Sequence, residues 1–255
     1  MHELPLVFFT VLGQSAVGAF ILLLLFSPYN GKQLGGRLFT TLCLFGIGLI
    51  IGVFHMGQLL RAINLFFGVG RSPMSNEIAL SALFGAFGAI SALGLLSGKG
   101  SAQLFKIFGW IAALMGIGFV AAIPAVYQLD TVAGWKTEYT WVVMLLTVFT
   151  GGGLIAAALG AGRKALWIAV IGIVASLLIR PSYLAVLWRA DNVLTSEQTL
   201  WFGFQLILML AALLIALFVL FKRLPRNWVY ASAASIIVAE LLGRVAFYNM
   251  WAMTM

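Results

Sequence analysis

Residues 4 to 26 read LPLVFFTVLGQSAVGAFILLLLF, an apolar run that contains no charged side chain. As an α-helix rising about 1.5 Å per residue, a run of this length can cross the hydrocarbon layer of a bilayer, which is about 30 Å thick. No basic segment precedes the run, and it is too long for the core of a signal peptide. We therefore predict that it is a retained first membrane span.

Similar apolar runs recur along all 255 residues, of which 63% are hydrophobic and only 9% are charged. A soluble domain carries about 25% charged residues, and the polar side chains of this sequence are too few to cover one. The runs are continuously apolar, whereas the strands of a β-barrel alternate. The sequence predicts an all-α integral membrane protein in which residues 1–255 form one bundle of about eight transmembrane helices. The spans are expected near residues 4–26, 38–56, 77–97, 107–127, 140–161, 165–187, 200–221 and 228–249.

Lys and Arg are unevenly divided between the connections. The first, third, fifth and seventh connections carry nine of them, and the connections on the opposite side carry four. The positive-inside rule then predicts that the N- and C-termini lie on the periplasmic side. The net charge of +8 does not indicate a nucleic-acid partner, because the basic residues lie singly or in pairs at the ends of apolar runs.

A few polar side chains fall inside the predicted spans, where an ionised group is costly and usually faces a partner or a wet cavity. Glu240 and Arg244 are four residues apart, so they lie on one helix face and can pair; a purely structural ion pair explains them equally well. With the predicted topology, the polar residues share the outer halves of their spans, which predicts a pocket open to the outer face. They are Gln14, His55, Glu77, Arg180, Gln205, Glu240 and Arg244.

A histidine beside a carboxylate can accept and release protons near neutral pH. Oxidation of a quinol releases two protons with two electrons, so His55 with Glu77 would suit a quinol site, although a lone histidine at a span end is more often interfacial. The only other histidine is His2, which disfavours a haem with two axial histidines. The single cysteine, Cys43, argues against a cysteine-ligated iron–sulfur cluster. We expect no haem and no cluster in this chain, so electrons would pass directly to a neighbouring redox protein.

The segment HMGQLLRAIN at residues 55–64, followed by VGRSPMSNE at residues 69–77, resembles the membrane-anchor subunit of bacterial dimethyl sulfoxide reductase, the DmsC family. HELPL at 2–6, FTVLGQ at 9–14, DTV at 130–132 and ELLGRVAFY at 240–248 match in the same order. The resemblance implies an eight-span anchor in the bacterial cytoplasmic membrane. Such an anchor binds menaquinol and passes electrons to an iron–sulfur subunit of the four-cluster, ferredoxin-like type, which supplies a molybdopterin catalytic subunit.

The resemblance implicates His55 and Glu77 in quinol binding. We predict that His55 accepts a proton and that Glu77 is its partner or the proton exit, in a site that the iron–sulfur subunit covers. The side chains predicted to shape the pocket are Gln14, Arg61, Arg180, Glu240 and Arg244. A secondary transporter or channel is the alternative, using the same charges as a substrate or proton path, but the two halves of the sequence show none of the repeat similarity common in transporters.

Overall fold

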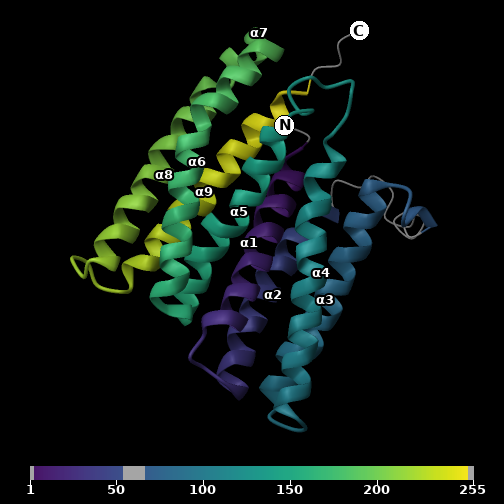
Figure 1. The fold of residues 1–255 in the computed structure, drawn as a ribbon, viewed down its shortest axis with the longest axis vertical. Helices are drawn as coiled ribbons and strands as arrows, with labels where there is room; N and C mark the ends of the chain where they lie inside the picture. The colour runs from purple at the N-terminus through teal and green to yellow at the C-terminus, as the bar shows by residue number, and fades with distance from the viewer. Residues whose placement is uncertain (1–2, 54–66, 252–255) are drawn as a thin grey trace.

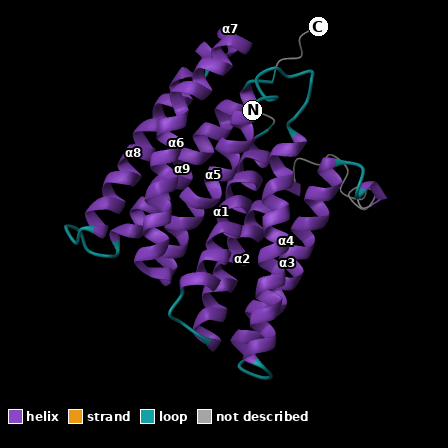
Figure 2. Ribbon diagram, in the orientation of Figure 1, coloured by secondary structure: helices purple, strands orange, loops and turns teal. Residues whose placement is uncertain are grey.

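The computed structural model describes residues 3–53 and 67–251, and within these ranges it is a bundle of helices without a strand (Figure 1, Figure 2). The predicted all-α class is therefore confirmed. Eight helices in the described ranges are long enough to form the bundle. They are α1 (Leu4–Phe26), α2 (Gly31–Val53), α3 (Pro73–Ser97), α4 (Ala102–Val126), α5 (Glu138–Ala156), α6 (Gly162–Ala190), α8 (Thr199–Leu220) and α9 (Trp228–Asn249). Two short elements are the π-helical turn η2 (Ala157–Ala161) and α7 (Asn192–Glu197).

Seven continuous helical segments in the described ranges are long and apolar enough to cross a membrane. The longest, Glu138–Ala190, has 53 residues and contains α5, η2 and α6. As one straight helix it would measure about 80 Å, far more than the bilayer requires. The helix is interrupted at Gly160, whose φ of 101° is open to glycine but costly for other residues. This segment therefore accounts for two of the eight predicted spans.

The α5–α6 turn folds the two helices back against each other. A Cβ atom added to Gly153 would lie 2.8 Å from the Cβ of Ala169, and one added to Gly172 would lie 2.9 Å from the Cβ of Phe149. The later residue of α5 thus faces the earlier residue of α6, so the two helices are antiparallel. Contact at this distance requires glycine, because a methyl group would clash with the neighbouring helix.

Three helices, α2, α3 and α4, begin at least four residues earlier than predicted. α2 begins at Gly31 and includes Lys32 and Arg37, which the charge pattern had placed in the preceding connection. Long basic side chains can extend from a helix to the membrane surface, so their presence does not end the span. α3 begins at Pro73, where a proline is compatible with the first helical turn. As a result Glu77 lies inside α3 rather than at its start.

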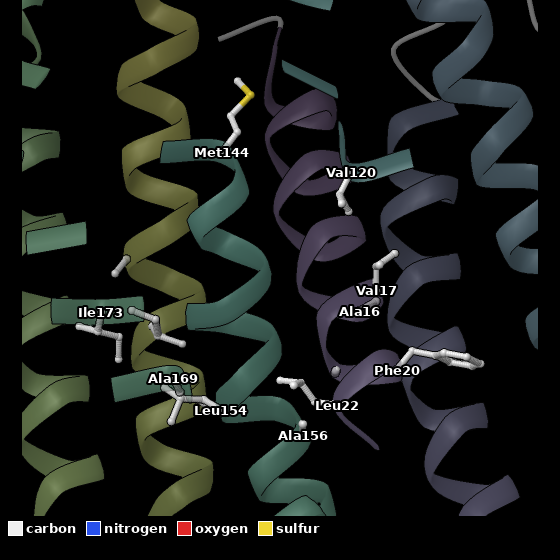
Figure 3. Packing of buried hydrophobic residues seen from close by; sticks show 14 of the residues in the cluster. Ala16, Val17, Phe20, Leu22, Val120, Met144, Leu154, Ala156, Ala169 and Ile173 are labelled. Carbon is white, nitrogen blue, oxygen red and sulfur yellow. The ribbon is translucent and has the colours of Figure 1, made fainter. Parts of the chain in front are cut away.

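α1 is the central helix of the bundle and packs against α2, α4, α5 and α9 (Figure 1). Figure 3 shows part of the apolar core, including Val17 and Phe20 of α1 and Leu154 of α5. The close contact between α1 and α2 uses Gly48, where an added Cβ would lie 3.1 Å from the Cβ of Leu12. Small residues let these helix backbones approach closely.

The two ends of the bundle differ in their connections. One end, called here the terminal end, carries residues 3 and 251, the 127–137 loop and α7 (Figure 1). The other, called the basic end, carries the turns at residues 27–30, 98–101, 160–162 and 221–227. The prediction that the terminal end faces the periplasm stays a prediction.

Candidate functional site

Glu240 and Arg244 lie one helical turn apart on α9, and each side chain is only 4% exposed. The Thr150 hydroxyl donates to Glu240 Oε1 (2.6 Å), and the Thr147 hydroxyl donates to Glu240 Oε2 (3.2 Å). Nη2 of Arg244 donates to Thr147 Oγ1 (3.2 Å) and to Gln14 Oε1 (2.8 Å). Thr147 therefore bridges the two charges, and among the described residues no direct ion pair joins them.

This arrangement, called here the polar layer, draws residues from three helices to one depth. Gln14 comes from α1, the two threonines come from α5, and the two charged residues come from α9. Each charge keeps two hydrogen bonds, as a buried ionised group requires if its desolvation is to be offset.

Arg180 of α6 lies beside the polar layer and is less well satisfied. Its guanidinium is 5.7 Å from the ring centroids of both Tyr183 and Phe202, a distance suited to cation–π attraction. Its Nε atom is buried without a hydrogen-bond partner in the described part of the chain, and the same holds for Oε1 of Gln205 on α8.

A small cavity separates Arg180 from the polar layer. Its volume is about 10 Å³, which is enough for about one water molecule. The lining residues are Thr140, Val143, Met144, Arg180, Tyr183, Gln205, Glu240, Gly243, Arg244 and Phe247. A water here would have several polar neighbours, but a quinol ring is far larger than the space. The arginines and Glu240 therefore form a closed layer in this structure.

Glu77 lies nearer the terminal end, in the second turn of α3, and is 5% exposed. Its carboxyl group forms no hydrogen bond or ion pair with another residue of the described ranges. Its buried neighbours include Tyr127, at the end of α4, and Tyr248 of α9, and it interacts electrostatically with both. A carboxyl group in this position can exchange protons with whatever molecule or side chain completes its surroundings.

The hydroxyls of Tyr127 and Tyr248 lie 2.5 Å apart, and either can donate. Arg244 also interacts electrostatically with both tyrosines, so the pair lies near the polar layer as well as near Glu77. Trp135 packs edge-on against Tyr127 and donates from its indole nitrogen to the carbonyl oxygen of Phe247 (2.8 Å). These aromatic contacts hold the tyrosine pair in a dry environment.

Although Tyr248 is only 2% exposed, it lies close to the surface of the terminal end. It lines a hollow of about 240 Å³ between the beginning of α1 and the end of α9, together with Val7, Val245 and Asn249. The tyrosine pair therefore lies near Glu77 and borders this hollow through Tyr248.

Five of the predicted site residues are buried at or above the middle of the bundle, on the side of the terminal end: Gln14, Glu77, Arg180, Glu240 and Arg244. Glu77 lies near the terminal end, whereas Gln14 and Glu240 lie near the middle of their helices. His55 and Arg61 fall in residues 54–66, outside the described residues.

Sequence reasoning did not identify the tyrosine pair or the two threonines. Tyr127 carries a weak signal, since its hydroxyl ends a span at about the depth of Glu77. Thr147 and Thr150 carry none, because a threonine within an apolar helix commonly bonds to its own backbone.

A helical bundle with apolar spans, a buried polar layer and an acidic residue near one end defines a multi-pass membrane protein built around an internal ionisable site. The family model described as DMSO reductase anchor subunit (DmsC) matches residues 1–250, and the protein belongs to this family. It is a multi-pass protein of the bacterial inner membrane.

Individual relatives agree with the family. The C subunit of anaerobic dimethyl sulfoxide reductase from Haemophilus influenzae is 32% identical over 272 residues, which cover 98% of this sequence and 95% of that protein. The anaerobic dimethyl sulfoxide reductase subunit YnfH of Escherichia coli is 39% identical over 163 residues, covering 62% of this sequence and 57% of the relative. The C subunit of the Escherichia coli enzyme is 35% identical over 161 residues, covering 60% and 56%. The last two matches span little more than half the length of these relatives.

Proposed function

We propose that this protein anchors a dimethyl sulfoxide reductase-type complex in the membrane and oxidises menaquinol at a site beside Glu77. Its partners are an iron–sulfur subunit, which receives the electrons, and a molybdopterin catalytic subunit, which uses them. Membership of the anchor-subunit family supports this function over the transporter alternative. The structural observation that carries the proposal is a buried carboxyl group without a hydrogen-bond partner in the described ranges, next to a pair of bonded tyrosines.

The reaction converts menaquinol to menaquinone and releases two protons and two electrons. Glu77 accepts a proton from one quinol hydroxyl, and His55 is the predicted acceptor for the other. The guanidinium of Arg244 interacts with both tyrosines and favours negative charge on a tyrosine oxygen that has lost its proton. Both electrons leave for the iron–sulfur subunit.

The tyrosine pair provides a route by which the proton leaves Glu77. A hydroxyl can accept one proton while it donates another, so Tyr127 and Tyr248 can pass a proton along their 2.5 Å hydrogen bond. Tyr248 ends this route at the hollow on the terminal end.

The test is to replace Glu77 with Gln in the assembled complex and to drive the reductase with either menaquinol or a reduced dye. Loss of a general base costs about 10²- to 10⁴-fold, so menaquinol-driven turnover should fall at least a hundredfold while dye-driven turnover is unchanged. Glu138→Gln is the matched control, because Glu138 is an exposed carboxylate at the same end of the bundle. Normal menaquinol turnover in the Glu77 variant would rule out the assignment.

A further inference from the structure

The basic end has a one-sided charge. The nine Lys and Arg in or near the four turns at this end have no acidic side chain beside them, since all seven Asp and Glu of the sequence lie elsewhere. Those seven are Glu3, Glu77, Asp130, Glu138, Asp191, Glu197 and Glu240. The protein therefore provides no side-chain carboxylate to balance these charges, and anions from the surroundings must do so.

Two hollows at this end concentrate the basic side chains. The first has a volume of about 470 Å³ and lies between the start of α6 and the α8–α9 loop. Its basic residues are Arg163, Lys222, Arg223 and Arg226, and its walls include the apolar Leu166, Val219 and Val229. The second, of about 400 Å³, is lined by Arg37, Arg226, Tyr29 and Tyr230 among others. Ala157 and Arg226 line both hollows, so the two adjoin.

The backbone of the α8–α9 loop fixes where its basic residues lie. The amides of Arg223 and Leu224 both donate to the carbonyl oxygen of Phe218, at 2.7 and 3.2 Å. Lys222 adopts a left-handed conformation with a φ of 56°, which turns the backbone after α8. Nη2 of Arg163 donates to the carbonyl oxygen of Leu220 (3.3 Å), which ties the start of α6 to this loop.

The second hollow is also held in place. Nε of Arg37 donates to the carbonyl oxygen of Leu159 (2.6 Å), and its guanidinium carbon lies 3.4 Å from the centroid of the Tyr29 ring. Such contacts leave part of the guanidinium available for a ligand while restricting its rotation, and a fixed donor loses less entropy on binding.

Exposed aromatic residues place both hollows at the surface of the membrane. Trp167, Trp228, Tyr230 and Phe221 are all exposed around this end, and the rings of Trp167 and Phe221 meet edge to face. Tryptophan and tyrosine concentrate at the level of the lipid headgroups. A ligand in these hollows would therefore have its charge at the headgroup level and apolar protein surface beneath it.

We propose that the adjoining hollows bind an anionic phospholipid that carries two phosphates, such as cardiolipin. One phosphate lies among Arg163, Lys222 and Arg223, the other lies near Arg37, and Arg226 stands between them. The acyl tails follow the apolar wall of the first hollow. Basic pockets between transmembrane helices are a recognised setting for such headgroups. The apolar wall and the exposed aromatic rings favour a lipid over free phosphate.

The test uses the full-length protein purified into nanodiscs of phosphatidylcholine that contain a small, fixed fraction of cardiolipin, with bound cardiolipin counted by native mass spectrometry. Arg226→Gln should weaken binding about fivefold, the effect expected for one basic residue at an anionic surface. Arg163→Gln combined with Arg226→Gln should weaken it about twenty-five-fold. The matched control combines Lys99→Gln and Lys106→Gln, which remove two charges from the same end without lining either hollow.

Three results would overturn the proposal. An equal loss in the Lys99 and Lys106 control would show general attraction to a basic surface. Full displacement of cardiolipin by millimolar inorganic phosphate would identify a site for soluble phosphate. In nanodiscs that contain phosphatidylglycerol in place of cardiolipin, binding as tight as that of cardiolipin would show that one phosphate is enough and would remove the two-phosphate assignment. We expect cardiolipin to bind the unsubstituted protein and the lysine control, and to be lost from the arginine variants.

Discussion

Replacing Thr147 with Val removes the hydroxyl that bridges Glu240 and Arg244 while keeping the shape of the side chain. Both hydrogen bonds of this hydroxyl are 3.2 Å long, whereas Glu240 keeps a 2.6 Å bond from Thr150 and Arg244 keeps a 2.8 Å bond to Gln14. Hydrogen bonds to charged groups contribute about 1.5 to 3 kcal/mol in soluble proteins. In membrane proteins the average is about 0.6 kcal/mol, and the largest values approach about 1.7 kcal/mol.

The combined contribution of these two 3.2 Å bonds to the free energy of unfolding should lie near the upper part of the range for membrane proteins. We therefore expect Thr147→Val to lower the free energy of unfolding by about 1 to 2 kcal/mol. Thr147→Ser retains the hydroxyl and should recover most of this loss. Thr40→Val serves as a control, because Thr40 is exposed and, within residues 3–53 and 67–251, its hydroxyl bonds only to Gly36 of its own helix (3.0 Å).

The measurement is equilibrium unfolding of the purified protein by a denaturing detergent, followed by circular dichroism and tryptophan fluorescence. The reasoning fails if Thr147→Val is as stable as the Thr40 control, or if Thr147→Ser is as unstable as Thr147→Val. In the first case the bridge contributes nothing, and in the second the packing of the methyl group, rather than the hydroxyl, stabilises the bundle.

Further substitutions test the proton route and the helix packing. Tyr127→Phe or Tyr248→Phe should slow menaquinol-driven reductase activity about tenfold or more, since either change breaks the hydroxyl pair. Dye-driven activity should stay intact. Unchanged menaquinol-driven turnover in both variants would exclude the route. Gly18→Ala should destabilise the bundle by about 1 to 3 kcal/mol, because its Cβ would lie 2.1 Å from the carbonyl oxygen of Val148. The control is Gly203→Ala, in open space within α8, which should be neutral or stabilise the helix by up to about 1 kcal/mol. Equal thermal stability of the two alanine variants would contradict the packing argument.

Hydropathy and spacing predicted the helices well, because hydropathy is a local property and an apolar segment in lipid must satisfy its own backbone groups as a helix does. The errors arose where a local rule ignored a distant partner. Arg37 was assigned to a connection, yet it belongs to α2, where its side chain bonds to Leu159, which is far away in the sequence. The charge of a residue does not reveal whether such a partner exists.

The same limit applies to the site. The spacing of Glu240 and Arg244 correctly placed both on one face of α9, but the Thr147 hydroxyl that bridges them comes from α5. Tyr127 and Tyr248 are 121 residues apart, and no periodicity within one span could pair them. The sequence predicted that Glu77, Arg180, Glu240 and Arg244 lie inside the bundle, whereas the neutral hydroxyls around them required the folded structure.

The glycines explain how the neutral hydroxyls reach the charges. On α5, Thr147 and Thr150 come just before three consecutive glycines, and a Cβ on the second of these, Gly152, would lie 2.7 Å from the Cα of Gly18 on α1. This contact brings the α1 and α5 backbones together about one helical turn from Gln14. The threonines can then reach Glu240 and Arg244 while Gln14 reaches Arg244 from the other side. Close packing and the polar layer are therefore coupled, so a side chain added at Gly152 should separate α5 from α1 and weaken the bonds to both buried charges.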